Sequence, residues 1–185
     1  MRIATWNVNS IRSRIDRVEA WLARTDVDVL LMQETKAKDE QFPYDHLHAL
    51  GYEVAHHGLS QWNGVAIASR VGLEDVQVGF DGDPGWGEPL AAEARSIGAT
   101  CGGIRLWSVY APNGRALEDP HMVYKLEWLA RLREQASEWA SECAGADQRF
   151  PNPGTSRVRA GMHQPHERRR AVTLVSMRVR HRSHR

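Results

Sequence analysis

The chain has 185 residues, 42% hydrophobic and 25% charged, a composition typical of one globular domain or of one domain with a tail. No segment approaches the roughly 18 consecutive apolar residues of a membrane-spanning helix, and two cysteines are too few for a disulfide framework. The N-terminal segment lacks the apolar core of a signal peptide, so we expect a cytoplasmic protein without a membrane contact.

The net charge of +1 conceals two different parts of the chain. Residues 1–140 carry 14 Lys and Arg against 20 Asp and Glu, whereas residues 141–185 carry 10 Arg and 3 acidic residues. This shift predicts a folded domain over residues 1–140 and an Arg/His-rich tail over residues 141–185.

The first 35 residues predict a strand, a helix and a second strand. Residues 2–8 alternate as a strand does, and residues 13–24 place apolar side chains at helical spacing after Ser13, a candidate N-cap. Residues 27–33 form a nearly continuous apolar run, which favours a buried strand. This order indicates a βαβ-like opening.

Further strands and one long helix are expected after this opening. Residues 63–69 predict a strand, and residues 92–98 and 104–110 predict a hairpin around Gly102 and Gly103. A loop then leads to a helix over residues 122–139. We expect the buried face of this helix to carry four aliphatic side chains, with Trp128 beside them: Val123, Leu126, Leu129 and Leu132.

The tail has too little apolar content to form a core, apart from a short strand predicted at residues 171–177. Arg outnumbers Lys 21 to 3 in the chain, which indicates GC-rich coding DNA, and a shifted reading frame in such DNA yields this mixture of Arg, His, Pro and Gly. The alternative is a disordered basic tail that binds nucleic acid.

Several polar residues follow predicted strands, where functional groups often gather: Asn7, Asn9, Glu34, Tyr110 and Asn113. A carboxylate among amides suits Mg²⁺, which prefers oxygen ligands and is often bound by one or two carboxylates together with substrate phosphate. Three cations that suit a phosphodiester lie nearby in sequence: Arg12, Lys36 and Arg115. Simpler interpretations remain open, because the asparagines can cap turns, Glu34 can be a surface acid and Tyr110 can belong to the core.

Six segments occur in the order in which the exonuclease III family has them. They are "RIATWNVNSIRSR", "DVDVLLMQETK" followed by "QFP", "GYEVAHHG", "WNGVAIASR", "VYAPNGR" and "YKLEWL". Over residues 1–139 the chain therefore resembles exonuclease III-type DNA-repair nucleases (exodeoxyribonuclease III and AP endonucleases) of the endonuclease/exonuclease/phosphatase superfamily.

The resemblance implies an α/β fold, a four-layer αββα sandwich of the DNase I-like type. It also implies Mg²⁺-dependent cleavage of double-stranded DNA at abasic sites or from 3′ ends, with Mn²⁺ as the alternative metal and no protein partner. By position, Glu34 would bind the metal with help from Asn7, and Tyr110 and Asn113 would act at the phosphate and sugar. Asn9, Arg12, Lys36 and Arg115 would contact DNA.

The match stops after Trp139. The family's Gly-Asp-x-Asn segment, with the Asp that activates water, and its terminal Ser-Asp-His are missing from the sequence that follows. We therefore expect an incomplete sandwich and an inactive chain. The alternatives are a non-catalytic DNA-binding protein with a basic tail and a phosphatase for a small phosphoester.

An incomplete sandwich would leave the inner face of the first sheet in water, which predicts a poorly soluble or molten chain. The exposed residues would include five aliphatic side chains: Val29, Leu31, Val65, Ile67 and Leu106.

Overall fold

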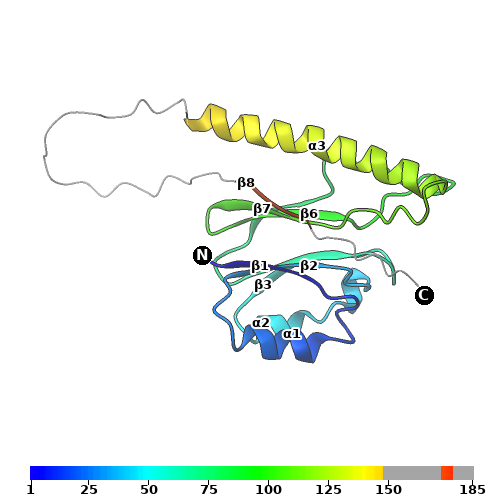
Figure 1. Cartoon of the computed structure of the whole chain (residues 1–185). Coiled ribbons are helices and arrows are strands. Elements are labelled where there is room, and N and C mark those ends of the chain that lie inside the picture. Colours follow the sequence, from blue (N-terminus) through cyan, green and yellow to red (C-terminus); the bar gives the residue numbers. More distant parts are fainter. Residues whose placement is uncertain (148–171, 177–185) are drawn as a thin grey trace, which may run out of the picture.

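Two four-stranded sheets lie face to face in the computed structural model, which describes residues 1–147 and 172–176 (Figure 1). The first sheet has the order β1-β2-β4-β3, with β1 Ile3–Asn7, β2 Val29–Gln33, β3 Glu53–His57 and β4 Val65–Ser69. The second has the order β5-β6-β7-β8, with β5 Glu74–Val78, β6 Ser96–Cys101, β7 Ile104–Val109 and β8 Val172–Ser176.

Helices cover the outer face of each sheet. Two helices, α1 Ile15–Leu22 and α2 Tyr44–His48, lie beneath the first sheet, and α3 Pro120–Asp147 lies above the second (Figure 1). A single 3₁₀ turn, η1 Asp39–Gln41, precedes α2. The layers therefore follow the predicted αββα order. No helix among the described residues combines the length and apolarity needed to cross a membrane.

The βαβ opening is confirmed. Strands β1 and β2 pair in parallel, with Asn7 opposite Gln33, and α1 connects them. Because parallel strands end at the same edge of a sheet, this register brings the residues after Asn7 and after Gln33 together. Strand β4 continues the sheet as an antiparallel partner of both β2 and β3.

The two sheets bury each other's inner faces. Val29, Leu31, Val65, Ile67 and Leu106 are all fully buried. The expectation that these side chains face water is wrong, because β5 to β8 of the same chain build the second sheet and cover them. Burial of both faces at such an interface is the usual source of stability in a two-sheet sandwich.

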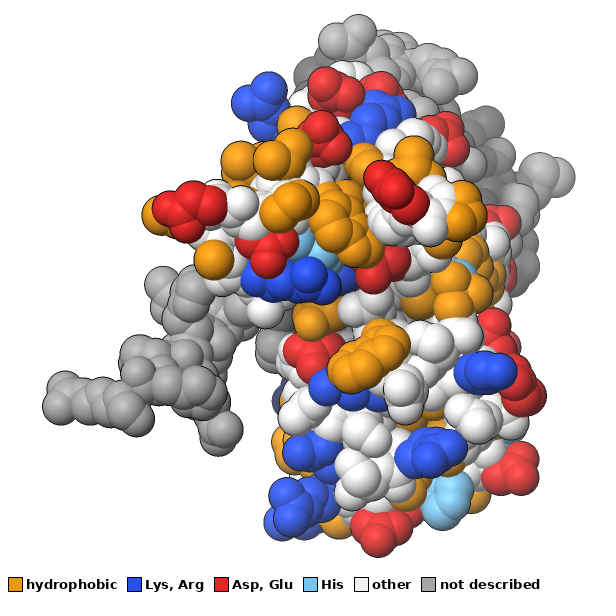
Figure 2. Space-filling model, turned by 90° about the vertical axis from the view of Figure 1, so that its right-hand side faces the viewer, with side chains coloured by type: hydrophobic (Ala, Val, Ile, Leu, Met, Phe, Trp, Pro, Cys, Tyr) orange, Lys and Arg blue, Asp and Glu red, His pale blue; other side chains and the backbone are white. Residues whose placement is uncertain are grey.

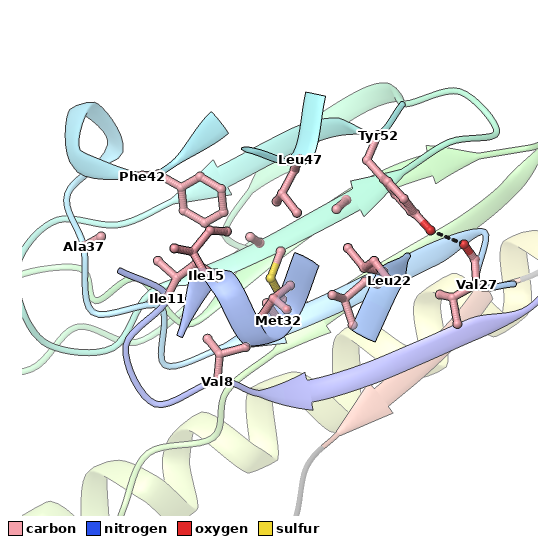
Figure 3. Close-up of a cluster of buried hydrophobic side chains, with 14 residues drawn as sticks. Val8, Ile11, Ile15, Leu22, Val27, Met32, Ala37, Phe42, Leu47 and Tyr52 are labelled. Atoms are coloured by element: carbon pink, nitrogen blue, oxygen red, sulfur yellow. Dashed lines mark hydrogen bonds between the residues drawn. The ribbon is translucent and has the colours of Figure 1, made fainter. Parts of the chain in front are cut away.

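A second core fills the space between the first sheet and its two helices (Figure 3). Val18 and Leu22 of α1, Leu47 of α2 and Met32 of β2 are buried there. The Tyr52 hydroxyl lies at one end of this core and donates a hydrogen bond to the Val27 carbonyl oxygen. The side-chain pattern of α1 thus agrees with the helix predicted at residues 13–24.

The start of α1 differs from the prediction. Its N-cap is Arg14, without a side-chain cap. The Ser13 hydroxyl instead donates a hydrogen bond, 3.2 Å long, to the Ser10 carbonyl oxygen. Ser13 therefore stabilises the turn before the helix rather than the helix itself.

The buried face of α3 agrees with the predicted one only at Trp128 and Leu132. Val123, Leu126 and Leu129 are 58%, 59% and 37% exposed, and Leu132 alone of the four aliphatic residues is buried. The face that packs on the second sheet is lined by Tyr124, Trp128, Leu132 and Trp139, which meet Phe80 and Trp107. These positions also recur at helical spacing, and aromatic rings bury more apolar area than the aliphatic set.

The predicted hairpin is confirmed with shifted ends, because β6 extends to Cys101 and turns at Gly102 and Gly103. Both glycines have positive φ, +54° and +80°, which a two-residue hairpin turn requires. Strand β8 lies within the segment predicted at residues 171–177 and pairs in parallel with β7. The other predictions for the tail concern residues outside the described part of the chain, apart from the end of α3.

Candidate active site

Three predicted site residues come from strand ends at one edge of the sandwich. Asn7 is the last residue of β1, Glu34 follows β2, and Tyr110 follows β7 of the facing sheet. The parallel register of β1 and β2 places Asn7 beside Glu34. Sheet stacking then adds Tyr110 from the other layer, so the cluster depends on both sheets.

Glu34 is held by its neighbours through both carboxylate oxygens. The Asn7 side-chain NH₂ donates a 2.6 Å hydrogen bond to Glu34 Oε1, and Lys36 Nζ lies 3.2 Å from Glu34 Oε2. Lys36 Nζ also donates to Asn9 Oδ1 at 2.6 Å, and the Asn9 backbone N–H donates to Asn7 Oδ1 at 3.1 Å. The four residues therefore form one closed hydrogen-bonded group.

Tyr110 completes this group. Its hydroxyl interacts with the Glu34 carboxylate, and Arg95 lies over its ring with the guanidinium carbon 5.2 Å from the ring centroid. Burial, followed by the negative charge of Glu34, raises the pKa of Tyr110 to about 12. Tyr110 is therefore a protonated donor at neutral pH.

The electrostatic state of Glu34 follows from two opposing effects. Burial alone would raise the pKa of this carboxyl, but the hydrogen bonds from Asn7, Lys36 and Tyr110 and the charge of Lys36 together lower it. Glu34 is thus a carboxylate at neutral pH, half-buried and already surrounded by donors.

Backbone conformation marks the same region. Asn9, Glu34, Lys36, Asn63 and Arg115 all have φ between +44° and +59°, the left-handed region that residues other than glycine seldom adopt. Such conformations cost about 1–3 kcal/mol each and persist only where the surrounding structure enforces them. They concentrate here in the turns that carry the predicted site residues.

A buried histidine supports the turn that holds Glu34. The His56 ring on β3 is fully buried, and its Nε2 lies 2.8 Å from Thr35 Oγ1. Its Nδ1 lies 2.8 Å from Asp39 Oδ1 without the alignment of a hydrogen bond. On the other side of Thr35, a Cβ atom at Gly64 would lie 2.0 Å from Thr35 Oγ1, so only glycine fits there.

A cavity of about 520 Å³ opens beside Tyr110. Asn113 and Arg115 line it, and both are exposed. Asn113 Oδ1 accepts the Arg115 backbone N–H at 3.0 Å, and the buried His121 ring contacts the Asn113 carbonyl oxygen through Nδ1. The structure therefore places the "PNGR" turn at the cavity that Tyr110 also lines.

Glu93 and Arg95 form a second polar centre, which the sequence reasoning missed. Glu93 accepts hydrogen bonds from Asn63 Nδ2 at 2.8 Å, Arg95 Nε at 2.7 Å and the Tyr124 hydroxyl at 2.9 Å. Arg95 also donates to the Tyr110 carbonyl oxygen at 3.3 Å. No known sequence motif identifies this pair, because "AEAR" resembles the start of a strand. Only the fold brings Asn63 and Tyr124 to Glu93.

Arg12 lies apart from this arrangement. It is exposed, and it makes no hydrogen bond or ion pair with the other described residues. Figure 2 shows the end of the molecule at which β1 and β2 finish, and there hydrophobic, acidic and basic side chains are intermixed, so the surface is not uniformly basic. Arg14, which was not predicted, binds the Asn9 carbonyl oxygen instead.

The oxygen atoms of this group suit a hydrated cation that is bound by both the protein and a substrate phosphate. Within the described residues, no group of three or more His, Cys, Asp and Glu side chains could hold a metal ion by itself. Asn7 presents its NH₂ group to Glu34, so the carboxylate oxygens of Glu34 are the ligands that this cluster offers. One carboxylate with water and phosphate is an arrangement that Mg²⁺ accepts.

Known proteins are similar to this chain in sequence and fold. Residues 4–171 match the model of the Endonuclease/Exonuclease/phosphatase family. Exodeoxyribonuclease III of Haemophilus influenzae is 36% identical over 83 residues, which are 45% of this chain and 31% of that protein.

Two solved structures are similar as well. An AP endonuclease from Archaeoglobus fulgidus has a TM-score of 0.68 at 42% identity, over 75% of this chain and 52% of the other. The 3′ phosphatase NExo from Neisseria, bound to a product DNA hairpin, has a TM-score of 0.70 at 37% identity, over 76% and 53%. The chain thus spans about half the length of these two proteins and a third of the Haemophilus enzyme. It belongs to the endonuclease/exonuclease/phosphatase family, in which exodeoxyribonuclease III and AP endonucleases are its relatives.

Proposed function

We propose that this chain is part of a Mg²⁺-dependent DNA-repair nuclease with 3′-to-5′ exonuclease and abasic-site endonuclease activity. The observation that carries the proposal is the group formed by Asn7, Glu34, Lys36 and Tyr110 at one edge of the sandwich. It combines a carboxylate for a hard cation with donors for a phosphate, and the relatives that share the fold are nucleases.

Each residue has a distinct role in this proposal. Glu34 would bind the cation, and Asn7 would fix the orientation of the Glu34 carboxylate. When bound, Mg²⁺ supplies charge stabilisation at the phosphate and the leaving oxygen. The Tyr110 hydroxyl, whose pKa is about 12, would donate a hydrogen bond to a phosphate oxygen, and its proton would stay in place.

The remaining predicted residues would position the DNA. Asn113 Oδ1 is already used within its turn, which leaves the amide nitrogen as a donor to the sugar or phosphate. Arg115 and Lys36 would contact phosphates on either side of Tyr110, and Asn9 would hold Lys36 in place. Arg12 would bind the backbone farther away. A DNA substrate agrees with the DNA hairpin bound to the Neisseria relative.

The 185-residue chain by itself should react slowly. The family's water-activating Asp and terminal His have no counterpart after Trp139. General-base assistance contributes typically about 10²–10⁴-fold, and removal of one fixed donor costs about 10²–10³-fold. We propose that this chain retains binding of metal and phosphate and lacks most of the catalytic acceleration.

The predicted cytoplasmic location stays a prediction.

Incision of a duplex with a single abasic site tests the proposal. With enzyme in excess over DNA, we expect slow cleavage that requires Mg²⁺ and disappears in Glu34→Ala. Glu40→Ala is the matched control, because Glu40 lies in η1, in the same connection between β2 and α2, and its side chain is 72% exposed. Cleavage unchanged by Glu34→Ala would reject the assigned role of Glu34, and rapid multiple turnover would reject the proposed loss of catalytic acceleration.

A further inference from the structure

The cavity beside Tyr110 has features that the phosphate chemistry does not use. Its rim carries two exposed apolar side chains, Leu59 at 52% and Trp62 at 65% exposure. Trp62 has the largest exposed apolar ring system among the described residues. The volume of about 520 Å³ is within the range of small-molecule pockets, about 300–1,000 Å³.

The turn that carries Trp62 is firmly held. The backbone N–H of Trp62 donates to Ser60 Oγ at 3.1 Å, and the Asn63 side chain is fixed by its hydrogen bond to Glu93. The backbone after it is bonded on both sides, with Gly64 N donating to the Ala94 oxygen at 3.0 Å and Lys36 N donating to the Asn63 oxygen at 2.9 Å. The indole is therefore presented to solvent by a rigid turn, as a preorganised binding group would be.

The part of the cavity wall formed by Glu93 and Arg95 is polar but electrically balanced. The Glu93 carboxylate lies 2.7 Å from Arg95 Nε and accepts two further hydrogen bonds, from Asn63 and Tyr124. Arg95 is 3% exposed, and its guanidinium group forms an ion pair with Glu93 and lies over the Tyr110 ring. A cation or a second phosphate gains little from this part of the wall, whereas a flat neutral group gains apolar contact at the rim formed by Leu59 and Trp62.

Aromatic rings support the inner wall. The Trp86 and His121 rings meet edge to face with centroids 4.5 Å apart, and His121 is buried. Tyr110 lines the same cavity, and its hydroxyl interacts with the Glu34 carboxylate. A group in the cavity is therefore the immediate neighbour of whatever lies at Tyr110.

We propose that this cavity receives the base of an unpaired nucleotide next to the phosphate at Tyr110, with the Trp62 indole stacking on that base. The proposal rests on the proposed function, because that function places a DNA phosphate at Tyr110. Stacking of a base on an aromatic side chain tolerates any sequence, since every base has a π face. Trp62 would then favour DNA whose strand is frayed or unpaired beside the cleavage point.

Two single-stranded oligonucleotides with equal numbers of phosphates test this inference. One is oligothymidylate, and the other carries tetrahydrofuran in place of every nucleoside. Charge contacts, including those of the Arg-rich residues 141–185, are the same for both. Fluorescence anisotropy without Mg²⁺ should show that the full chain binds oligothymidylate about tenfold more tightly, the scale expected for one stacked base.

The variants decide whether Trp62 is responsible. Trp62→Ala should make the two affinities equal, and Trp62→Phe should retain most of the preference. A thermal melt checks that Trp62→Ala is folded, which its exposure predicts. A preference that survives in Trp62→Ala, is lost in Trp62→Phe or is absent from the unsubstituted chain would overturn the inference.

Glu34→Ala separates this inference from the proposed function. This variant should keep the preference for oligothymidylate, because Glu34 does not line the cavity. A Trp62-dependent preference combined with cleavage that ignores Glu34 would keep the base site and reject the nuclease assignment. Loss of the preference in Glu34→Ala would overturn the base site as an independent feature.

Discussion

Glu34 illustrates how single residues keep a half-buried charge in place. Burial opposes the ionised form, and the hydrogen bonds from Asn7, Lys36 and Tyr110 overcome that penalty, so the pKa falls. The folded-state pKa lies below the unfolded value. The resulting stabilisation is present above the unfolded pKa and is lost as the pH falls through the folded pKa.

Asn7→Ala should raise the pKa of Glu34, because burial remains while a 2.6 Å hydrogen bond disappears. A hydrogen bond to a charged group contributes about 1.5–3 kcal/mol, so the variant should also unfold more easily by that amount. Carboxyl-carbon NMR titration measures the first effect, and urea denaturation at neutral pH measures the second. Asn113→Ala is the control, and an equal pKa change in that variant would argue against the assigned contact.

His56 should also make the stability of the fold depend on pH, but here the cause is burial of a group in its neutral form. Burial, the largest effect, lowers the pKa of this imidazole from 6.5 to about 4, although Asp39 opposes the change. As the pH falls, the imidazole takes up its proton in the unfolded chain before it does so in the folded one. The free energy of unfolding is therefore unaffected by this group above pH 6.5 and declines between pH 6.5 and about pH 4. The total loss is on the order of 3 kcal/mol.

Urea denaturation at pH values on both sides of this window measures the effect. His56→Gln can still hydrogen-bond to Thr35 but does not titrate, so its stability should change less with pH. His48→Gln, at an exposed position of α2, should behave as the unsubstituted chain does. Identical pH dependence in all three proteins would mean that His56 is not the titrating group.

At the scale of elements, sequence periodicity located α3 but placed three exposed aliphatic residues on its buried face. The aliphatic residues Val123, Leu126 and Leu129 satisfy a helical pattern, and so do Tyr124, Trp128 and Leu132. Two overlapping patterns cannot be ranked without the opposing surface, which here is Phe80 and Trp107 from distant segments. Trp139 stacks on Trp107 with ring centroids 4.4 Å apart, a contact that no local pattern predicts.

Two substitutions on α3 test the assigned face. Trp128 is fully buried and meets Phe80 edge to face, so Trp128→Ala should cost about 3–5 kcal/mol of unfolding free energy. Leu126 is 59% exposed, so Leu126→Ala should change it by less than about 0.5 kcal/mol. Chemical denaturation followed by circular dichroism gives both values. The reverse ranking would contradict the assigned face.

At the scale of the whole molecule, sequence reasoning supplied parts of the site and the fold supplied their arrangement. The strand ends at Asn7, Glu34 and Tyr110 were recognisable from motifs and from apolar runs. The position of Tyr110 opposite Glu34 depends on how the two sheets stack. Glu93, Arg95 and His56 were missed because each acts through partners far along the chain.

The stacked sheets also change the expected behaviour of the chain. A bare inner face would have predicted a molten protein, but that face is covered, and the two sheets share one core. Because neither sheet can lose its partner without exposing this core, we expect residues 1–147 to unfold as one cooperative unit. Near-ultraviolet and far-ultraviolet circular dichroism should then show coincident transitions.

The shared core can be probed by one substitution on each side of it. Ile67 lies fully buried on β4 between the sheets, so Ile67→Ala should cost about 2–5 kcal/mol and shift both transitions together. Val78 on the edge strand β5 is 53% exposed, and Val78→Ala should have little effect. If Ile67→Ala shifted only one of the two signals, the sheets would be folding separately. The group around Glu34 and Tyr110 would then be only transiently assembled, because its members come from different sheets.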